Sequence, residues 1–186
     1  MRTRTSLLRI AFCGLFIALI TISAKLTIPM SPVPFTLQTA VVLLAGVCLG
    51  WRGCLYSVGG YILLGLLGVP VFAMGGGIQY ALMPTFGFTV GFLAGSVVTA
   101  LCLRVEMPSL KRLITAVSAG TVTIYVIGIL WYLLLQLFWF GNPIDLWKIL
   151  LTFWIMFIPS DILKGALVVF VGDRLRRFLK KNGVVF

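Results

Sequence analysis

Long, uninterrupted apolar segments fill most of this sequence, and they restrict the surroundings in which the chain can fold. Hydrophobic residues make up 61% of the 186 residues, and only 10% of the residues are charged. A water-soluble domain of this length does not need so much apolar surface, so the sequence predicts an integral membrane protein. The segments are continuous and do not alternate between apolar and polar residues, which disfavours an outer-membrane barrel.

Six of these segments are predicted to be transmembrane helices of a single all-α domain, residues 1–186. A helix needs about 20 residues to span a bilayer, so the shorter segments require help from the adjoining loops. The predicted fold is a compact six-helix bundle in which apolar outer loops cap a ligand pocket. The predicted helices are 7–24, 37–49, 54–67, 86–103, 113–138 and 147–171.

The basic residues are unevenly distributed between the loops, and this sets the predicted orientation. If the N-terminus is inside, the outer loops hold only Lys25 and Lys148, and Lys164 lies within a span. Basic loops stay on the cytoplasmic side, so we predict a multi-pass protein of the plasma (inner) membrane with both termini in the cytoplasm. The net charge of +11 then reflects topology, and no nucleic acid partner is expected. The cytoplasmic basic residues are Arg2, Arg4, Arg9, Arg52, Arg104, Lys111, Arg112, Arg174, Arg176, Arg177, Lys180 and Lys181.

Two of the outer loops are apolar and rich in proline or glycine: KLTIPMSPVPFTLQT (25–39) and GVPVFAMGGGIQYALMPTFG (68–87). Irregular backbone at membrane depth is tolerated only where it is buried in protein or lines a cavity. One interpretation is a re-entrant plug that fills the bundle. The interpretation we favour is a cap over a pocket that opens to the outside. The prolines predict that residues 30–36 form a stiff flap that ligand binding orders.

A carboxylate and an ammonium interrupt the apolar stretch FWIMFIPSDILKGALVVF. Asp161 and Lys164 are three residues apart, so both project from nearly one face of a helix. Pro159, just upstream, is predicted to bend that helix. The pair could be an internal strut, but a buried ion pair is weak evidence for stability. Ionisable residues within a span indicate a functional site by default, and this is the interpretation we favour.

The chemistry of this pair limits the ligands that suit it. A carboxylate only accepts hydrogen bonds and an ammonium only donates them. Together they match a small neutral group that has N–H donors beside a carbonyl, such as a cyclic urea. Large side chains nearby form either an apolar slot for the rest of a ligand or ordinary core. These side chains are Tyr56, Phe72, Met74, Tyr80 and Phe88.

Several kinds of chemistry are absent from the sequence. It contains no G-x-x-x-x-G-K-[ST] motif, so the chain has no nucleotide site of this type. It has no histidine and no C-x-x-C, and only four acidic residues, so neither a metal site, a cofactor nor an enzyme activity is expected. The cysteines are predicted to be small buried hydrophobic residues: Cys13, Cys48, Cys54 and Cys102.

Small residues recur at helical spacing in two segments. Gly87, Gly91 and Gly95 follow one another at every fourth position, which gives a smooth face for close helix approach. Gly14 and Ala18 have the same spacing in the first segment, with Ala11 one turn earlier. The pattern predicts tight packing, either inside the chain or against a partner.

Four motifs in this sequence resemble the BioY family, the biotin-specific substrate-binding membrane components of energy-coupling factor (ECF) transporters. They are IPMSPVPFTLQTAVVLLAGVCLG, LLGLLGVPVFAMGGG, PTFGFTVGF and IPSDILKGAL. The match runs from about residue 25 to residue 164, and the motifs occur in the family's order and at its spacing. The resemblance therefore implies a membrane protein that binds biotin as its transported ligand.

The resemblance also implies roles for individual residues. Asp161 and Lys164 would bind the ureido ring, the acid taking its N–H groups and the ammonium its carbonyl. The second outer loop has bulkier residues than the family pattern and no arginine nearby, which leaves backbone N–H groups, Gln79, Tyr80 or Lys25 to hold the biotin carboxylate. The outer loop that closes over biotin would include Thr36, Leu37, Gln38 and Thr39, and the glycine-rich loop Gly75, Gly76 and Gly77.

The resemblance further implies partners. In the family, a small-residue face on the first helix contacts a transmembrane coupling protein, and Ala11, Gly14 and Ala18 are the residues here that match it. Two ATPase subunits would complete the transporter, with membrane lipid around it. The alternative is a facilitator or secondary transporter that moves biotin or another small vitamin by itself, and the sequence does not separate the two.

Overall fold

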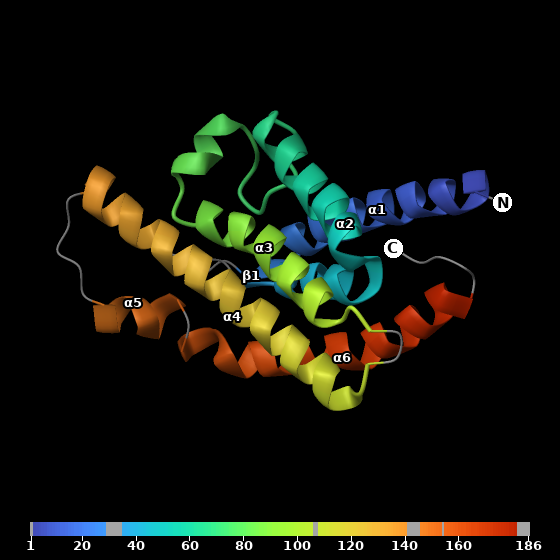
Figure 1. Ribbon diagram of the computed structural model, residues 1–186. Helices are drawn as coiled ribbons and strands as arrows, with labels where there is room; N and C mark the ends of the chain where they lie inside the picture. Colours follow the sequence, from blue (N-terminus) through green and yellow to red (C-terminus); the bar gives the residue numbers. More distant parts are fainter. Residues whose placement is uncertain (1, 29–34, 106–107, 141–145, 154, 182–186) are drawn as a thin grey trace.

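The computed structural model describes residues 2–28, 35–105, 108–140, 146–153 and 155–181, and these residues are mostly helical (Figure 1). The predicted all-α class is confirmed. Four helices are long and apolar enough to cross a membrane, and a fifth apolar helix of 10–17 residues accompanies them. The elements are α1 (Arg2–Lys25), β1 (Thr27–Ile28), β2 (Phe35–Thr36), α2 (Gln38–Leu66), η1 (Ile78–Leu82), α3 (Phe86–Cys102), α4 (Leu110–Leu135), η2 (Gln136–Phe140), α5 (Leu146–Phe153), η3 (Ile155–Phe157) and α6 (Ile158–Lys181).

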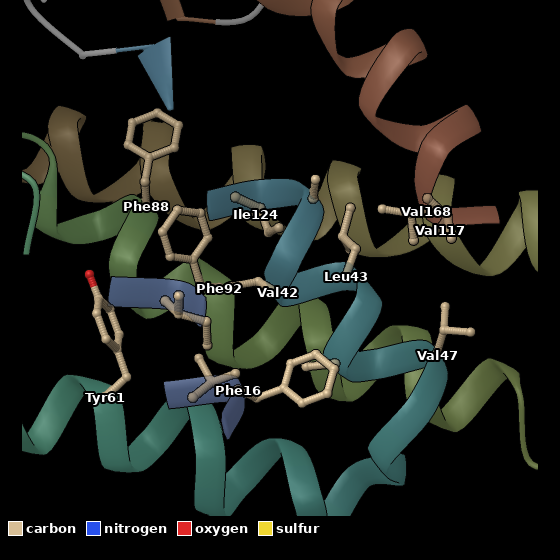
Figure 2. Close-up of a cluster of buried hydrophobic side chains, with 14 of the residues drawn as sticks. Phe16, Val42, Leu43, Val47, Tyr61, Phe88, Phe92, Val117, Ile124 and Val168 are labelled. Carbon is tan, nitrogen blue, oxygen red and sulfur yellow. The ribbon is translucent and has the colours of Figure 1, made fainter. Parts of the chain in front are cut away.

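The longest helix, α2, is broken at Gly50. This residue has φ 64° and ψ 174° within an otherwise helical segment, a conformation that glycine adopts readily because it has no Cβ. The break lies between the predicted helices 37–49 and 54–67. In Figure 2, Val42 lies on the first half of α2, and Tyr61 lies on the second half, which follows a separate path. The sequence thus located the break correctly, although the two halves join without an intervening loop.

The predicted helix 147–171 is divided in the structure into α5, the short 3-10 segment η3 and α6. Pro159 is the second residue of α6. Proline is tolerated in a first turn because the N–H that it lacks would have no partner there. The expectation that Pro159 bends one continuous helix is therefore wrong, since the proline stands where α6 begins. As a result, Asp161 lies in the first turn of α6, where the helix dipole favours a negative charge.

The glycine face of α3 packs against α4 inside the chain. A Cβ added at Gly91 would lie 2.7 Å from the carbonyl oxygen of Ile124, and one added at Gly95 would lie 2.7 Å from that of Gly120. The backbones therefore approach too closely for any larger side chain. This packing confirms the predicted close approach and fixes the partner of this face as α4.

The described helices give the bundle two distinct ends (Figure 1). The beginning of α1 and the end of α6 lie at the right in this view, whereas α3 and α6 begin and α4 ends toward the left. Between the ends, apolar side chains from several helices form the core. Figure 2 shows Phe88, Phe92 and Ile124 gathered near Val42 of α2. The cavity described next lies beside this aromatic part of the core.

Candidate functional site

Asp161 and Lys164 form a buried ion pair on α6. The Lys164 Nζ lies 3.2 Å from Asp161 Oδ1, and the side chains of the lysine and the aspartate are 7% and 9% exposed. The second carboxylate oxygen, Oδ2, accepts a hydrogen bond from the hydroxyl of Tyr125 on α4. The ammonium also stands 4.3 Å from the centre of the Phe35 ring, a distance typical of a cation–π contact. Each charge is thus compensated by more than one neighbour.

A cavity lies against this pair and is lined by residues from both halves of the chain. Its volume is about 50 Å³, so a larger ligand requires the lining side chains to move apart. The wall is mixed: aromatic rings surround hydroxyl and amide groups, the combination that small-molecule sites use for shape and orientation. The lining residues are Thr36, Gln38, Thr39, Ala73, Tyr80, Thr85, Phe88, Thr89, Phe92, Ile124, Tyr125, Phe153, Phe157 and Lys164.

The structure brings together some of the predicted site residues. Thr36, Gln38, Tyr80 and Lys164 all line the cavity. Asp161 is not among the residues that line this cavity, and it lines instead a separate apolar groove of about 610 Å³ between α4 and α6. The ion pair therefore lies between the cavity, which Lys164 lines, and the groove, which Asp161 lines.

The glycine-rich loop lies close by but does not contribute its glycines to the lining. The amide of Gly77 donates to the Gly65 carbonyl at 2.7 Å, so this loop is tied to the end of α2. Gln79 is exposed and donates to the Gly76 carbonyl at 2.9 Å. Gly75 has φ 119°, which a residue with a side chain rarely adopts. The glycines thus shape the turn that presents Tyr80 to the cavity.

Two polar contacts hold this loop against the helices. The hydroxyl of the fully buried Tyr61 donates to the Val71 carbonyl at the start of the loop at 3.4 Å, and it accepts from the side-chain amide of Gln38 at 2.8 Å. The Lys25 ammonium donates to the Phe72 carbonyl at 2.8 Å, and this lysine is not among the residues that line the cavity. Lys25 therefore connects the end of α1 to the loop.

The first predicted flap is only partly described. Its ends form a short antiparallel ladder, in which Thr27 pairs with Thr36 and Ile28 pairs with Phe35. Residues 29–34, which form most of the predicted flap, lie outside the described part of the chain. The ladder places Phe35 over Lys164 and against Phe157, whose ring centroid is 6.1 Å away.

Sequence reasoning missed several residues of the site. Tyr125 lies in a largely apolar span, 36 residues before its partner Asp161, and no spacing rule connects the two residues. Thr85 is the N-cap residue of α3, and Thr89 lies within this helix. Their four-residue spacing in the sequence was the signal for a shared polar face. Of the large side chains considered, Tyr80 and Phe88 line the cavity, Phe72 packs on Tyr80, and Tyr56 and Met74 are exposed.

The small residues of α1 lie on its outer surface. Ala11, Gly14 and Ala18 are all exposed, and a Cβ added at Gly14 would meet nothing within 4 Å. No element in the described part of the chain covers this face at Gly14. By contrast, the glycines of α3 are buried against α4.

The fold and the cavity together define a multi-pass helical membrane protein with an ion pair in the wall of a small polar and aromatic cavity. The chain belongs to the BioY family, whose family model matches residues 1–181. It is 34% identical to a probable biotin transporter BioY of Pyrococcus horikoshii, over 90% of this chain and 95% of that one. It is 43% identical to a probable biotin transporter BioY of Lysinibacillus sphaericus, over 69% of this chain and 66% of that one.

A solved structure has the same fold. It is the crystal structure of the S-component for biotin from an ECF-type ABC transporter. The TM-score is 0.82, the sequences are 27% identical, and the match covers 95% of each chain. The family is one of transporters, so the expectation that the chain is not an enzyme agrees with the comparisons.

Proposed function

We propose that this protein is the biotin-binding subunit of an ECF transporter and that biotin occupies the cavity beside Lys164. The observation that carries the proposal is the buried Asp161–Lys164 pair at that cavity, in a fold that is similar to a biotin S-component. The Asp161 carboxylate accepts from the ureido N–H groups, and the Lys164 ammonium donates to the ureido carbonyl. A carboxylate has about four lone-pair sites, so Asp161 keeps capacity beyond its bonds to Tyr125 and Lys164.

The cavity must widen before it holds a ligand of this size. The ring of Phe35 lies over Lys164, and the segment that carries it is a two-residue strand that pairs only with another two-residue strand. Such a short ladder separates at little cost. Displacement of Phe35 therefore opens the ion pair to the ureido ring, and its return closes the site from water. The glycine-rich loop, tied through Gly77 to α2, stays in place as the opposite wall.

The proposed arrangement in the plasma membrane follows the basic residues. Each half of α2 is a separate crossing, so that the bundle has six spans and both termini are cytoplasmic. The cavity then opens outward, because α3 and α6 begin at the opposite end from the start of α1 (Figure 1). Cysteines placed at Ile78 and Ser109, each in a background without the native cysteines, test this orientation. We expect an impermeant thiol reagent to label intact cells at Ile78 and not at Ser109, and the reverse result would invert the topology.

The proposed partners are a transmembrane coupling protein and two ATPase subunits, with lipid around the bundle. The exposed face formed by Ala11, Gly14 and Ala18 is flat enough for another helix to approach closely. A Gly14→Leu variant is expected to bind biotin normally but to lose co-purification with the coupling protein. Gly59→Leu is the matched control, because a Cβ at Gly59 also meets nothing within 4 Å.

One pair of measurements tests the function as a whole. The purified chain is titrated with biotin and with unrelated vitamins, and uptake is measured in cells with and without the coupling protein and ATPases. We expect selective biotin binding by the chain alone and uptake only in the presence of the partners. Uptake without them would favour the self-sufficient transporter, and failure to bind biotin would refute the proposal.

A further inference from the structure

The apolar groove between α4 and α6 lies on the outer surface of the bundle. Large exposed side chains line it, including Leu110, Ile114 and Phe170. A small residue helps to leave the hollow, because a Cβ added at Gly165 on α6 would lie only 3.8 Å from a methyl group of Val117 on α4. An exposed apolar surface of this kind marks a site of contact with membrane or protein.

The dimensions of the groove suit a lipid chain better than a helix. Its lining runs from Leu110 to Val122 on α4 and from Ile158 to Phe170 on α6, which is about 18 Å at the rise of a helix. One leaflet of the hydrocarbon core is about 15 Å deep. A volume of about 610 Å³ over this length gives a cross-section of roughly 35 Å², whereas a helix with its side chains is about 10 Å across. The groove is therefore too narrow for a helix, and it extends over about one leaflet.

Two cations stand at the end of the groove that is farther from Asp161. The Arg174 guanidinium lies 4.4 Å from the centre of the Phe170 ring, which lines the groove. Lys111 precedes the lining residue Ile114 by three positions, so it projects from the same face of α4. Neither cation has a hydrogen bond or an ion pair within the described part of the chain. Both charges are therefore available to a ligand.

Neighbouring groups do not cancel these two charges. Asp173 is already joined to Arg177 at 2.8 Å, so that pair has no net charge. Helix α4 begins at Leu110 with no acidic residue in its first turn, and its dipole favours a negative group there. Arg176 donates to two carbonyls of the loop before α4 and adds a further positive charge. Among the residues that the structure describes, this end of the groove is therefore positive.

We propose that the groove holds one acyl chain of an anionic phospholipid, whose headgroup binds to Lys111 and Arg174. The apolar lining matches the chain, and the two cations match the headgroup. The proposed topology puts this end of the groove at the cytoplasmic leaflet, where basic residues beside a span attract anionic lipids. The bound chain covers the groove side of Asp161. Only the choice of leaflet rests on the proposed topology, and the lipid site does not depend on biotin binding.

The test compares phosphatidylglycerol, which is anionic, with phosphatidylcholine of the same acyl chains, which has no net charge. Each lipid is titrated into the purified full-length chain in detergent, and native mass spectrometry counts the lipids that each chain retains. We expect the wild type to retain one phosphatidylglycerol and to prefer it over phosphatidylcholine. Lys111→Gln and Arg174→Gln are each expected to reduce this preference by about fivefold, the effect of one basic residue near an anionic surface.

Matched variants separate the headgroup contact from the acyl contact. Arg52→Gln removes a cytoplasmic cation that stacks on Trp51 away from the groove, and the lipid preference is expected to remain as in the wild type. Gly165→Leu fills the groove and is expected to lose both lipids. Its control is Gly59→Leu, which adds the same side chain where a Cβ meets nothing within 4 Å. If size-exclusion chromatography shows that Gly165→Leu is misfolded, Ala166→Leu, which also lies in the groove lining, replaces it.

Each contrary result overturns a stated part of the proposal. Equal retention of the two lipids by the wild type would remove the headgroup site. Equal losses in Arg52→Gln and Arg174→Gln would show that the total charge of the surface, and not this groove, attracts the lipid. Full lipid retention by Gly165→Leu would place the acyl chain elsewhere. A wild type that retains no lipid and is a dimer, which Gly165→Leu converts to a monomer, would assign the groove to a second copy of the chain. Biotin titration of the same samples shows separately whether the proposed function stands.

Discussion

Helix α6 contains two ion pairs of similar chemistry in opposite surroundings. The Asp161–Lys164 pair has side chains that are 9% and 7% exposed, and Tyr125 bonds to the same carboxylate. The Asp173–Arg177 pair lies three turns later, joined at 2.8 Å, and its side chains are 30% and 68% exposed. The second pair has the shorter contact, yet its side chains are far more exposed. The comparison of the two pairs shows that a short N···O distance does not by itself identify an ion pair as a candidate functional site, and that burial must be considered too.

Desolvation explains why the two pairs carry different information. An exposed pair is worth about 0–1 kcal/mol, because water screens the attraction and two side chains lose freedom. A buried pair costs several kcal/mol per ion to desolvate, so apolar residues of similar size often stabilise a fold better. Asp161 and Lys164 are therefore expensive as a strut. Under the proposed function, their cost is offset when a ligand of matching polarity uses both charges.

The largest expected effect follows from removing one partner of the buried pair. Asp161→Asn or Lys164→Met strands the remaining group, and the loss for a buried pair is about 3–5 kcal/mol. We expect biotin binding to fall by about a hundredfold or more, with a smaller fall in folded yield. Titration of detergent-purified protein measures the affinity, and size-exclusion chromatography measures the folded fraction. A variant that binds biotin with near wild-type affinity would remove that residue from the site.

Removing both charges of the buried pair distinguishes a ligand-binding role from a purely structural one. The double variant Asp161→Leu, Lys164→Met leaves no unpaired charge, so its thermal stability is expected to return to within about 1–2 kcal/mol of the wild type. Biotin binding is expected to stay lost, since no group then matches the ureido ring. Thermal unfolding and titration of the same sample check the two parts. Recovery of binding together with stability would show that the pair only supports the fold.

A smaller effect is expected at Tyr125, which bonds to Asp161 from α4. Tyr125→Phe keeps the ring and removes one hydrogen bond to a charged group, an interaction worth about 1.5–3 kcal/mol. We expect biotin affinity to fall by roughly one order of magnitude, because the carboxylate loses the bond that fixes its direction. Tyr132→Phe, on the same helix, is the control, since its hydroxyl bonds to Gln136 rather than to the ion pair. Equal losses in both variants would indicate a general effect on α4.

The same contrast shows what the sequence could predict. Apolar length and the uneven basic residues predicted a helical membrane bundle, because the bilayer constrains every span in the same way. The Asp161–Lys164 pairing was also predictable, since three residues of helix separate the two groups. The glycines of α3 predicted close packing, but only the structure could identify α4 as the partner.

Contacts between distant segments could not be predicted from spacing. Tyr125 reaches Asp161 from another helix, and Thr89 lines the cavity from α3, whose glycines pack closely against α4. The prediction that Pro159 bends a continuous helix failed for a local reason. The φ restriction of proline is the same within a bend and in the first turn of a helix, so the sequence does not distinguish the two. Whether the helix continues before Pro159 or begins there depends on the tertiary packing of the preceding residues.

The smallest expected effect concerns the exposed pair, which serves as the matched control for the buried one. Arg177 donates to both carboxylate oxygens of Asp173, at 2.8 and 3.2 Å, so its geometry is the better of the two. Exposed i,i+4 pairs are nevertheless worth only about 0.3–0.5 kcal/mol. Asp173→Asn is therefore expected to leave biotin affinity unchanged and to lower the unfolding midpoint by a degree or two at most. The small stability effect should disappear in high salt, because screening already weakens the wild-type pair. If Asp173→Asn instead reduced biotin binding as strongly as Asp161→Asn, the charge of α6 as a whole would govern the ligand, and the distinction between the two pairs would be lost.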